Sequence, residues 1–208
     1  MGTTQNLLPA ICAAKQKTIV LDMDNTLLYM TRQHLASCDF SVIVKYGSKD
    51  ITCCWRKRPH VESLLEELRK HNYEIIVFTS AIKEYADAAL DKLDVNKAID
   101  YRLYRDSGTQ VKEGYIKDLS KLGRDLKNVF IVDDNPVSYK LQPENAFPIK
   151  SFVDDRNDTE LLKVIDFCKL AAEADDVREA LRMQSNTDTN AETSGNMKLE
   201  PEAKRKRL

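Results

Sequence analysis

The stretch Lys17-Thr-Ile-Val-Leu-Asp-Met-Asp-Asn-Thr26 decides the fold, because a short apolar run ends abruptly in a cluster of polar side chains. Its residues 18–21 have the length and apolar character of a buried strand. Asp22 and Asp24 follow at once, so the stretch predicts a strand that delivers two carboxylates to the edge of a sheet. Taken alone the pattern is ambiguous, because Asp and Asn after a strand are also ordinary turn and capping residues.

Further apolar runs alternate with amphipathic segments along the chain. We expect strands at 41–46, 51–55, 73–78, 101–104 and 129–132, and helices from Pro59, over 83–93 and after Asn157. Apolar strands separated by amphipathic helices are typical of a parallel sheet that is covered on both faces. The pattern therefore predicts an α/β fold with a small β-hairpin insert at about 39–57.

The length of 208 residues favours one domain with tails. We expect an ordered unit over 17–183. Residues 1–16 show no clear periodicity and are expected to be a flexible segment. Residues 184–208 are polar and lack aromatic side chains, which is typical of a disordered tail.

The composition excludes several classes of protein. With 32 basic and 33 acidic residues the chain is nearly neutral, so its bulk charge indicates neither nucleic-acid nor membrane binding. The apolar stretch at 7–14 is too short to span a bilayer. The five cysteines form no CxxC pair, which disfavours a disulfide framework and a zinc site and favours a reducing intracellular compartment.

Polar clusters follow three of the predicted strands, at 22–26, 79–80 and 133–135. In an open α/β sheet this edge binds ligands, so we expect the clusters to converge. Adjacent acids such as Asp133 and Asp134 are best tolerated with a divalent cation or a lysine between them. Lys117 is the candidate lysine, and oxygen ligands of this kind select Mg²⁺. A phosphate could enter so negative a pocket only with such a metal.

Five motifs, in order and spacing, resemble the small C-terminal-domain phosphatases of the haloacid dehalogenase superfamily, which act on phosphoserine in the tail of RNA polymerase II. The motifs are Asp22-Met-Asp-Asn-Thr26, Arg58-Pro-His60, Phe78-Thr-Ser80 with Tyr85-Ala-Asp87, Lys117-Asp-Leu-Ser120 and Val132-Asp-Asp134. The resemblance runs from about Lys17 to Met183. It implies a haloacid dehalogenase-like (Rossmann-like) fold and a phosphoprotein phosphatase.

The resemblance also implies catalytic roles. Asp22 would attack phosphorus to form an aspartyl-phosphate, while Asp24 would protonate the leaving seryl oxygen and then activate water. Mg²⁺ would be held by Asp22, by the backbone carbonyl of Asp24 and by Asp134. The residue that matches Asp134 is often Asn in the small phosphatases, and either residue can bind the metal.

Substrate-binding roles follow in the same way. Thr79 and Ser80 would bind the phosphate, and Lys117 would pair with the phosphate and with Asp133. Arg105 would contact the substrate phosphate, although an arginine there could equally form a surface ion pair. Tyr85 matches one wall of an aromatic peptide pocket, but the position ten residues after the nucleophile, aromatic in those relatives, is Arg32 here.

These observations favour a magnesium-dependent protein serine/threonine phosphatase. Its partner would be a phosphorylated protein or peptide, with the RNA polymerase II C-terminal domain as one candidate, and no nucleic acid or membrane would be bound directly. The alternatives are a small-molecule phosphatase of the same superfamily, which usually needs a larger lid, and a non-catalytic binding module. The basic cluster Lys204, Arg205, Lys206 and Arg207 predicts a nuclear location, with the cytoplasm as second choice.

Overall fold

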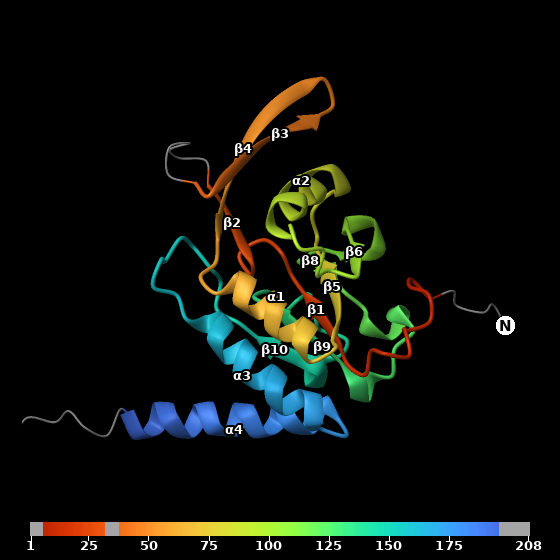
Figure 1. The fold of residues 1–208 in the computed structure, drawn as a ribbon, viewed down its shortest axis with the longest axis vertical. Coiled ribbons are helices and arrows are strands. Elements are labelled where there is room, and N and C mark those ends of the chain that lie inside the picture. Colours follow the sequence, from red (N-terminus) through yellow and green to blue (C-terminus); the bar gives the residue numbers. More distant parts are fainter. Residues whose placement is uncertain (1–5, 32–37, 196–208) are drawn as a thin grey trace, which may run out of the picture.

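A computed structural model describes residues 6–31 and 38–195, and its centre is a parallel five-stranded sheet in the order β10-β9-β1-β5-β6. The strands are β1 (Thr18–Leu21), β5 (Glu74–Phe78), β6 (Tyr101–Leu103), β9 (Val129–Asp133) and β10 (Ala146–Pro148). β1 lies between β9 and β5 (Figure 1), and all four of its residues are buried. The predicted parallel sheet is therefore confirmed.

The two faces of this sheet are covered differently. The α-helices are α1 (Val61–Lys70), α2 (Lys83–Leu93), α3 (Glu160–Glu173) and α4 (Val177–Gly195). Buried side chains from all four join one apolar cluster with Ile19 and Leu21 of β1. Val20 points to the other face, which the 3₁₀ helix Leu119–Leu122 and Leu8 help to cover. Alternate residues of β1 thus enter two cores, which explains why the whole strand is apolar.

A second, antiparallel sheet forms the insert that Figure 1 shows rising beyond α2. It contains β2 (Leu28–Thr31), β3 (Phe40–Tyr46) and β4 (Lys49–Lys57), with β4 in the middle. The predicted hairpin is confirmed, but the sequence pattern did not reveal β2. A smaller hairpin, β7 (Thr109–Val111) with β8 (Gly114–Ile116), lies farther along the chain.

The cysteine prediction is wrong in one respect, because Cys38 and Cys54 form a disulfide. Cys54 lies opposite Ser41 in the β3–β4 register, and Cys38 comes just before β3. This pairing places the two Cα atoms 5.7 Å apart. The bond depends on the strand register, which cysteine spacing alone does not show.

Part of each terminal segment of the described chain contacts the domain. Leu7 donates its backbone N–H to the Lys121 carbonyl, so part of the segment expected to be flexible is bound. Helix α4 continues to Gly195, twelve residues into the segment expected to be disordered from 184 on. Its first turns pack through Val177 and Leu181. No helix within residues 6–31 and 38–195 has the length and apolarity to cross a bilayer.

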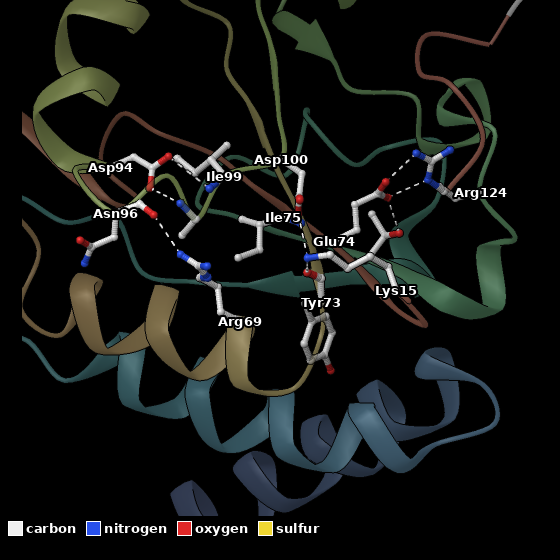
Figure 2. A network of polar contacts seen from close by, with 12 residues as sticks. Lys15, Arg69, Tyr73, Glu74, Ile75, Asp94, Asn96, Ile99, Asp100 and Arg124 are labelled. Carbon is white, nitrogen blue, oxygen red and sulfur yellow. Dashed lines mark hydrogen bonds and ion pairs between the residues drawn. The ribbon is translucent and has the colours of Figure 1, made fainter. Parts of the chain in front are cut away.

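Figure 2 shows a polar network at the amino-terminal edge of the central sheet. The Arg124 guanidinium binds both carboxylate oxygens of Glu74 at 2.7 Å, and Glu74 also accepts from the Thr18 hydroxyl. Arg124 further donates to the Pro9 carbonyl, and Lys15 donates to the Tyr73 carbonyl. Because Glu74 and Arg124 are buried and fully paired, they fix the starts of β1 and β5. The opposite edge of the sheet is left to carry the polar clusters.

Candidate active site

Three carboxylates meet at the carboxyl-terminal edge of the central sheet. Asp22 follows β1, Asp133 ends β9, and the two strands run in register with Leu21 opposite Val132. Asp134 comes next, and oxygens from these three aspartates lie within 4.8 Å of one another. The structure therefore brings together acidic residues that are more than a hundred positions apart in the sequence.

Lys117, which follows β8, inserts its ammonium group between two of these carboxylates. Its Nζ lies 2.5 Å from Asp22 Oδ1 and 2.7 Å from Asp133 Oδ2, and only 2% of its side chain is exposed. Burial alone would lower the pKa of Lys117, but the charges of Asp22 and Asp133 outweigh it and hold the pKa above its usual value. The lysine is therefore cationic. Three ionised carboxylates and one lysine would still leave a formal charge of −2.

The hydrogen bonds separate the roles of the three aspartates. Asp133 has both oxygens occupied, one by Lys117 and the other by the Asn135 backbone N–H at 2.8 Å. Lys117 binds only one oxygen of Asp22, and the Ser151 hydroxyl binds only one oxygen of Asp134, at 2.6 Å. Among the described residues, no other side chain binds the second oxygen of Asp22 or of Asp134. These two residues can therefore each offer an oxygen to a ligand.

This donor set fits Mg²⁺. Hard oxygen ligands and a net negative charge suit a small divalent cation. Asp22 and Asp134 would hold it, together with the Asp24 backbone carbonyl that the family resemblance indicates. Burial also raises the pKa of Asp133 to about 6 and raises that of Asp134, with the charge of Asp22 contributing in both cases. A bound cation would stabilise the ionised carboxylates and so lower these two pKa values again.

Asp24 occupies a different environment from Asp22. Tyr85, on α2, donates its hydroxyl to Asp24 Oδ1 at 2.9 Å, and Trp55 Nε1 donates to that hydroxyl oxygen at 3.2 Å. Burial, followed by the charge of Asp22, raises the pKa of Asp24 to about 7, while the Tyr85 bond opposes the rise. Asp24 can therefore both release and accept a proton near neutral pH.

Arg105 and Ser80 lie with Tyr85 and Asp24 around a pocket of about 380 Å³. Its remaining walls come from the insert and from the start of α2, and they are Val44, Ile51, Cys53, Ala81 and Ile82. Arg105 Nε donates to the Ser80 carbonyl at 2.8 Å, which leaves its two terminal nitrogens without a hydrogen-bond partner among the described residues. Arg105 and Asp24 thus line the same pocket, and two nitrogens of the Arg105 guanidinium are available to a ligand there. Arg32, the expected departure in this pocket, lies outside the described residues.

Thr79 is buried directly after β5, next to Ser80 of this pocket. Its hydroxyl oxygen accepts the Ala81 N–H at 3.0 Å, which orients the hydroxyl and leaves its proton available to a phosphate oxygen. Every candidate site residue that the structure describes therefore lies at this edge of the sheet or around the adjoining pocket.

The sequence pattern did not reveal the residues that support the site. Arg58 is fully buried, binds both oxygens of Asp158, and donates to the Thr26 carbonyl and the Lys150 carbonyl. It therefore ties the loop after β1 to the loop that carries Ser151. Arg58 belongs to one of the five motifs found in the sequence, but the sequence did not indicate its role. Ser151 and the bond from Trp55 to Tyr85 have no local sequence signal.

Comparison with known proteins places this geometry in a family. The family model of NLI interacting factor-like phosphatases matches residues 17–178. The chain belongs to this family. It is 42% identical over 170 residues to a probable C-terminal domain small phosphatase of Dictyostelium discoideum, covering 82% of this chain and 55% of that protein. It is 38% identical over 171 residues to the human CTD small phosphatase-like protein, covering 82% of this chain and 62% of that one. The chain thus spans little more than half the length of these two relatives.

Solved structures support the fold of this family member. The fission yeast RNA polymerase II CTD phosphatase Fcp1 aligns with a TM-score of 0.56 at 18% identity, covering 86% of this chain and 57% of that one. A haloacid dehalogenase-superfamily hydrolase from Ehrlichia chaffeensis aligns with a TM-score of 0.50 at 14% identity, covering 75% and 98%. The predicted haloacid dehalogenase-like fold is therefore confirmed.

Proposed function

We propose that this protein is a magnesium-dependent protein serine/threonine phosphatase that uses Asp22 as its nucleophile. The observation that carries the proposal is the contrast between two aspartates at the end of one strand. Asp22 contacts the Lys117 ammonium, whereas Asp24 binds a tyrosine hydroxyl and has a pKa raised to about 7. Such a pair supplies a nucleophile and a general acid at the same pH.

The chemistry proceeds in two displacements. A carboxylate oxygen of Asp22 attacks phosphorus, the bond from phosphorus to the seryl oxygen breaks, and Asp24 gives its proton to that oxygen. Asp24 then takes a proton from water, whose oxygen attacks the aspartyl-phosphate and releases inorganic phosphate and free Asp22. Lys117, which contacts Asp22 at 2.5 Å, and the Thr79 hydroxyl at the end of the neighbouring strand β5 would bind phosphate oxygens. When bound, Mg²⁺ would neutralise the charge that phosphate and carboxylates share.

A polypeptide is the substrate that suits this site. The insert contributes one wall of the pocket through Val44, Ile51 and Cys53, and no large helical cap is present among residues 6–31 and 38–195. A small metabolite would need a lid to exclude water. The name of a human relative, carboxy-terminal domain RNA polymerase II polypeptide A small phosphatase 1, suggests that domain as a substrate. Our proposal is that the phosphorylated residue is a phosphoserine of that domain or of another nuclear protein. A nuclear location also accords with the basic cluster at 204–207, which lies outside the described residues.

Hydrolysis assays on the full chain test this function. An aryl phosphate and a panel of phosphoserine, phosphothreonine and phosphotyrosine peptides would be compared with Mg²⁺ and with a chelator. We expect Asp22→Asn to abolish turnover, whereas Asp91→Asn, which changes an exposed aspartate of α2, should leave it intact. Turnover that survives the chelator or Asp22→Asn would refute the mechanism. Faster hydrolysis of sugar phosphates than of every peptide would refute the protein substrate.

The nuclear location has its own test. A fluorescent fusion of the full chain should be nuclear, and deletion of residues 204–207 should release it into the cytoplasm. If the deleted protein stays nuclear, the basic cluster is not the signal.

A further inference from the structure

A second pocket, of about 600 Å³, adjoins the one that contains Asp24. It is bounded by the start of α2, by residues 104–106 and by the β7–β8 hairpin. Ile82 and Arg105 line both pockets, so the two hollows share a wall. A substrate polypeptide that leaves the first pocket across Ile82 and Arg105 would therefore enter the second.

The cationic side chains of the second pocket are held in place by other groups. Lys83 Nζ binds Asp87 at 2.7 Å and the Tyr104 hydroxyl at 3.1 Å, and it lies 4.6 Å from the centre of the Tyr104 ring. The Arg105 guanidinium lies 5.5 Å from the centre of the Tyr115 ring. Two aromatic rings therefore form part of the pocket wall, each beside a cation.

The formal charges of this pocket cancel. Lys83 and Arg105 are balanced by Glu84 and Asp106, all four of which line it. Its free hydrogen-bonding groups include the Gln110 amide and the Tyr115 hydroxyl, neither of which has a side-chain partner among the described residues. Ring faces, neutral donors and acceptors, and zero net charge suit an uncharged stretch of extended polypeptide better than a second phosphate.

We propose that this pocket is a second substrate site, which binds uncharged residues flanking the phosphoserine on one side. The inference rests on the proposed function, because it requires the phosphorylated residue to lie at Asp22 and Asp24. Arg105 then serves both parts of the substrate. Its terminal nitrogens are available to the phosphate, while its side-chain carbons and the neighbouring Tyr115 ring contact the flanking residues. Binding energy from those residues raises kcat/KM for long peptides and contributes nothing to an aryl phosphate.

The test compares three kinds of substrate. One phosphoserine peptide ends shortly after the phosphoserine on both sides, and two others carry neutral extensions on the amino or the carboxyl side. We expect one extension to raise kcat/KM about tenfold in the unaltered protein. An acidic or phosphorylated extension of equal length should give a smaller gain. Equal kcat/KM for the short peptide and both neutral extensions, or a larger gain from the acidic one, would overturn the proposal.

Substitutions in β7 test whether the gain in kcat/KM from a neutral extension arises in the second pocket. Gln110→Trp fills the pocket from an exposed strand position, and Gln110→Arg places a charge there. Both should remove the gain from the extension. Thr109→Trp is the matched control, because it adds the same side chain to the adjacent exposed position of the strand, which does not line the pocket. An unchanged gain in both Gln110 variants, or an equal loss in Thr109→Trp, would refute the second site.

The aryl phosphate separates this inference from the function on which it rests. If the unaltered protein hydrolyses neither the aryl phosphate nor any peptide, the phosphatase itself is refuted. If the aryl phosphate and the short peptide are hydrolysed and no extension helps, only the second site is refuted. Melting temperatures of the three variants, measured alongside, identify any that fails to fold.

Discussion

The bond from Tyr85 to Asp24 allows a direct test of the general acid. Tyr85→Phe keeps the ring, which packs 5.3 Å from the centre of the Trp55 ring, and removes only the hydroxyl that donates to Asp24. That hydroxyl stabilises the charged carboxylate and so holds the pKa of Asp24 lower than burial alone would set it. Its removal must therefore raise the pKa of Asp24.

The size of the change follows from the strength of such a bond. A hydrogen bond to a charged group contributes about 1.5 kcal/mol at the lower end of its range. Asp24 is partly exposed, so water can replace some of the loss, and the lower end applies. Since about 1.4 kcal/mol corresponds to one pKa unit, Tyr85→Phe should raise the pKa of Asp24 by about one unit from its value of about 7.

The assay is kcat/KM against pH on a phosphoserine peptide at saturating Mg²⁺. An alkyl alcohol leaves only with a proton, so the alkaline limb reports the acid form of Asp24 in the free enzyme. A bound cation lowers the pKa of Asp24 equally in the unaltered protein and in Tyr85→Phe. The test therefore compares the alkaline limbs of these two proteins. Tyr85→Phe should move the alkaline limb upward by about one pH unit.

Tyr73→Phe is the control for the loss of a tyrosine hydroxyl. The Tyr73 hydroxyl donates to the Cys168 carbonyl at 2.7 Å, and Tyr73 itself lies at the opposite edge of the sheet. This variant should lose stability and keep the position of the limb. If the limb of Tyr85→Phe keeps its place or moves to lower pH, Asp24 is not the acid that the limb reports.

Three further predictions concern the metal, the buried charge and the disulfide. Ser151→Ala removes the hydroxyl that binds Asp134, and it should raise the Mg²⁺ concentration for half-maximal thermal stabilisation about tenfold. Ser120→Ala, which removes a similar bond to Asp118, should leave that concentration unchanged. Equal effects of the two substitutions would contradict the role of Ser151. In chelator, the raised pKa values of Asp24 (about 7) and Asp133 (about 6) mean that the folded state binds more protons than the unfolded state above pH 4, so the melting temperature should fall from pH 5 to pH 7.5. Added Mg²⁺ should restore it, and a rise in chelator would contradict the buried cluster. Cys38→Ser should lower the free energy of unfolding by up to about 3 kcal/mol, because it removes the disulfide. Cys12→Ser, at an exposed free cysteine, should leave that free energy unchanged. Equal denaturant midpoints for the two variants would argue against the disulfide.

Residues that follow a strand could be predicted to meet, because a parallel sheet aligns the ends of its strands. This local rule placed Asp22 and Asp133 at one edge, and the apolar runs gave the strands themselves. What the sequence did not show are contacts fixed by packing between distant elements. Tyr85 lies 61 residues from Asp24, and the direction of its hydroxyl depends on how α2 packs against the insert. Ser151, the bonds that Arg58 makes and the Cys38–Cys54 disulfide were missed for the same reason.

The pair Asp133-Asp134 shows how the backbone gives identical side chains different roles. Successive residues at the end of a strand point to opposite sides, so Lys117 can reach only one of them closely. Asp133 turns toward Lys117 and the Asn135 N–H, has both oxygens filled and is 1% exposed. Asp134 accepts from the Ser151 hydroxyl, and no other side chain of the described residues binds its second oxygen. It follows that Asp133→Asn should leave Lys117 poorly neutralised and weaken the fold, because a buried cation would lose half its charge partners. Asp134→Asn keeps an oxygen ligand and should weaken Mg²⁺ binding with little effect on the melting temperature in chelator. If the two variants instead lose stability equally in chelator, the division of roles between these neighbours is wrong.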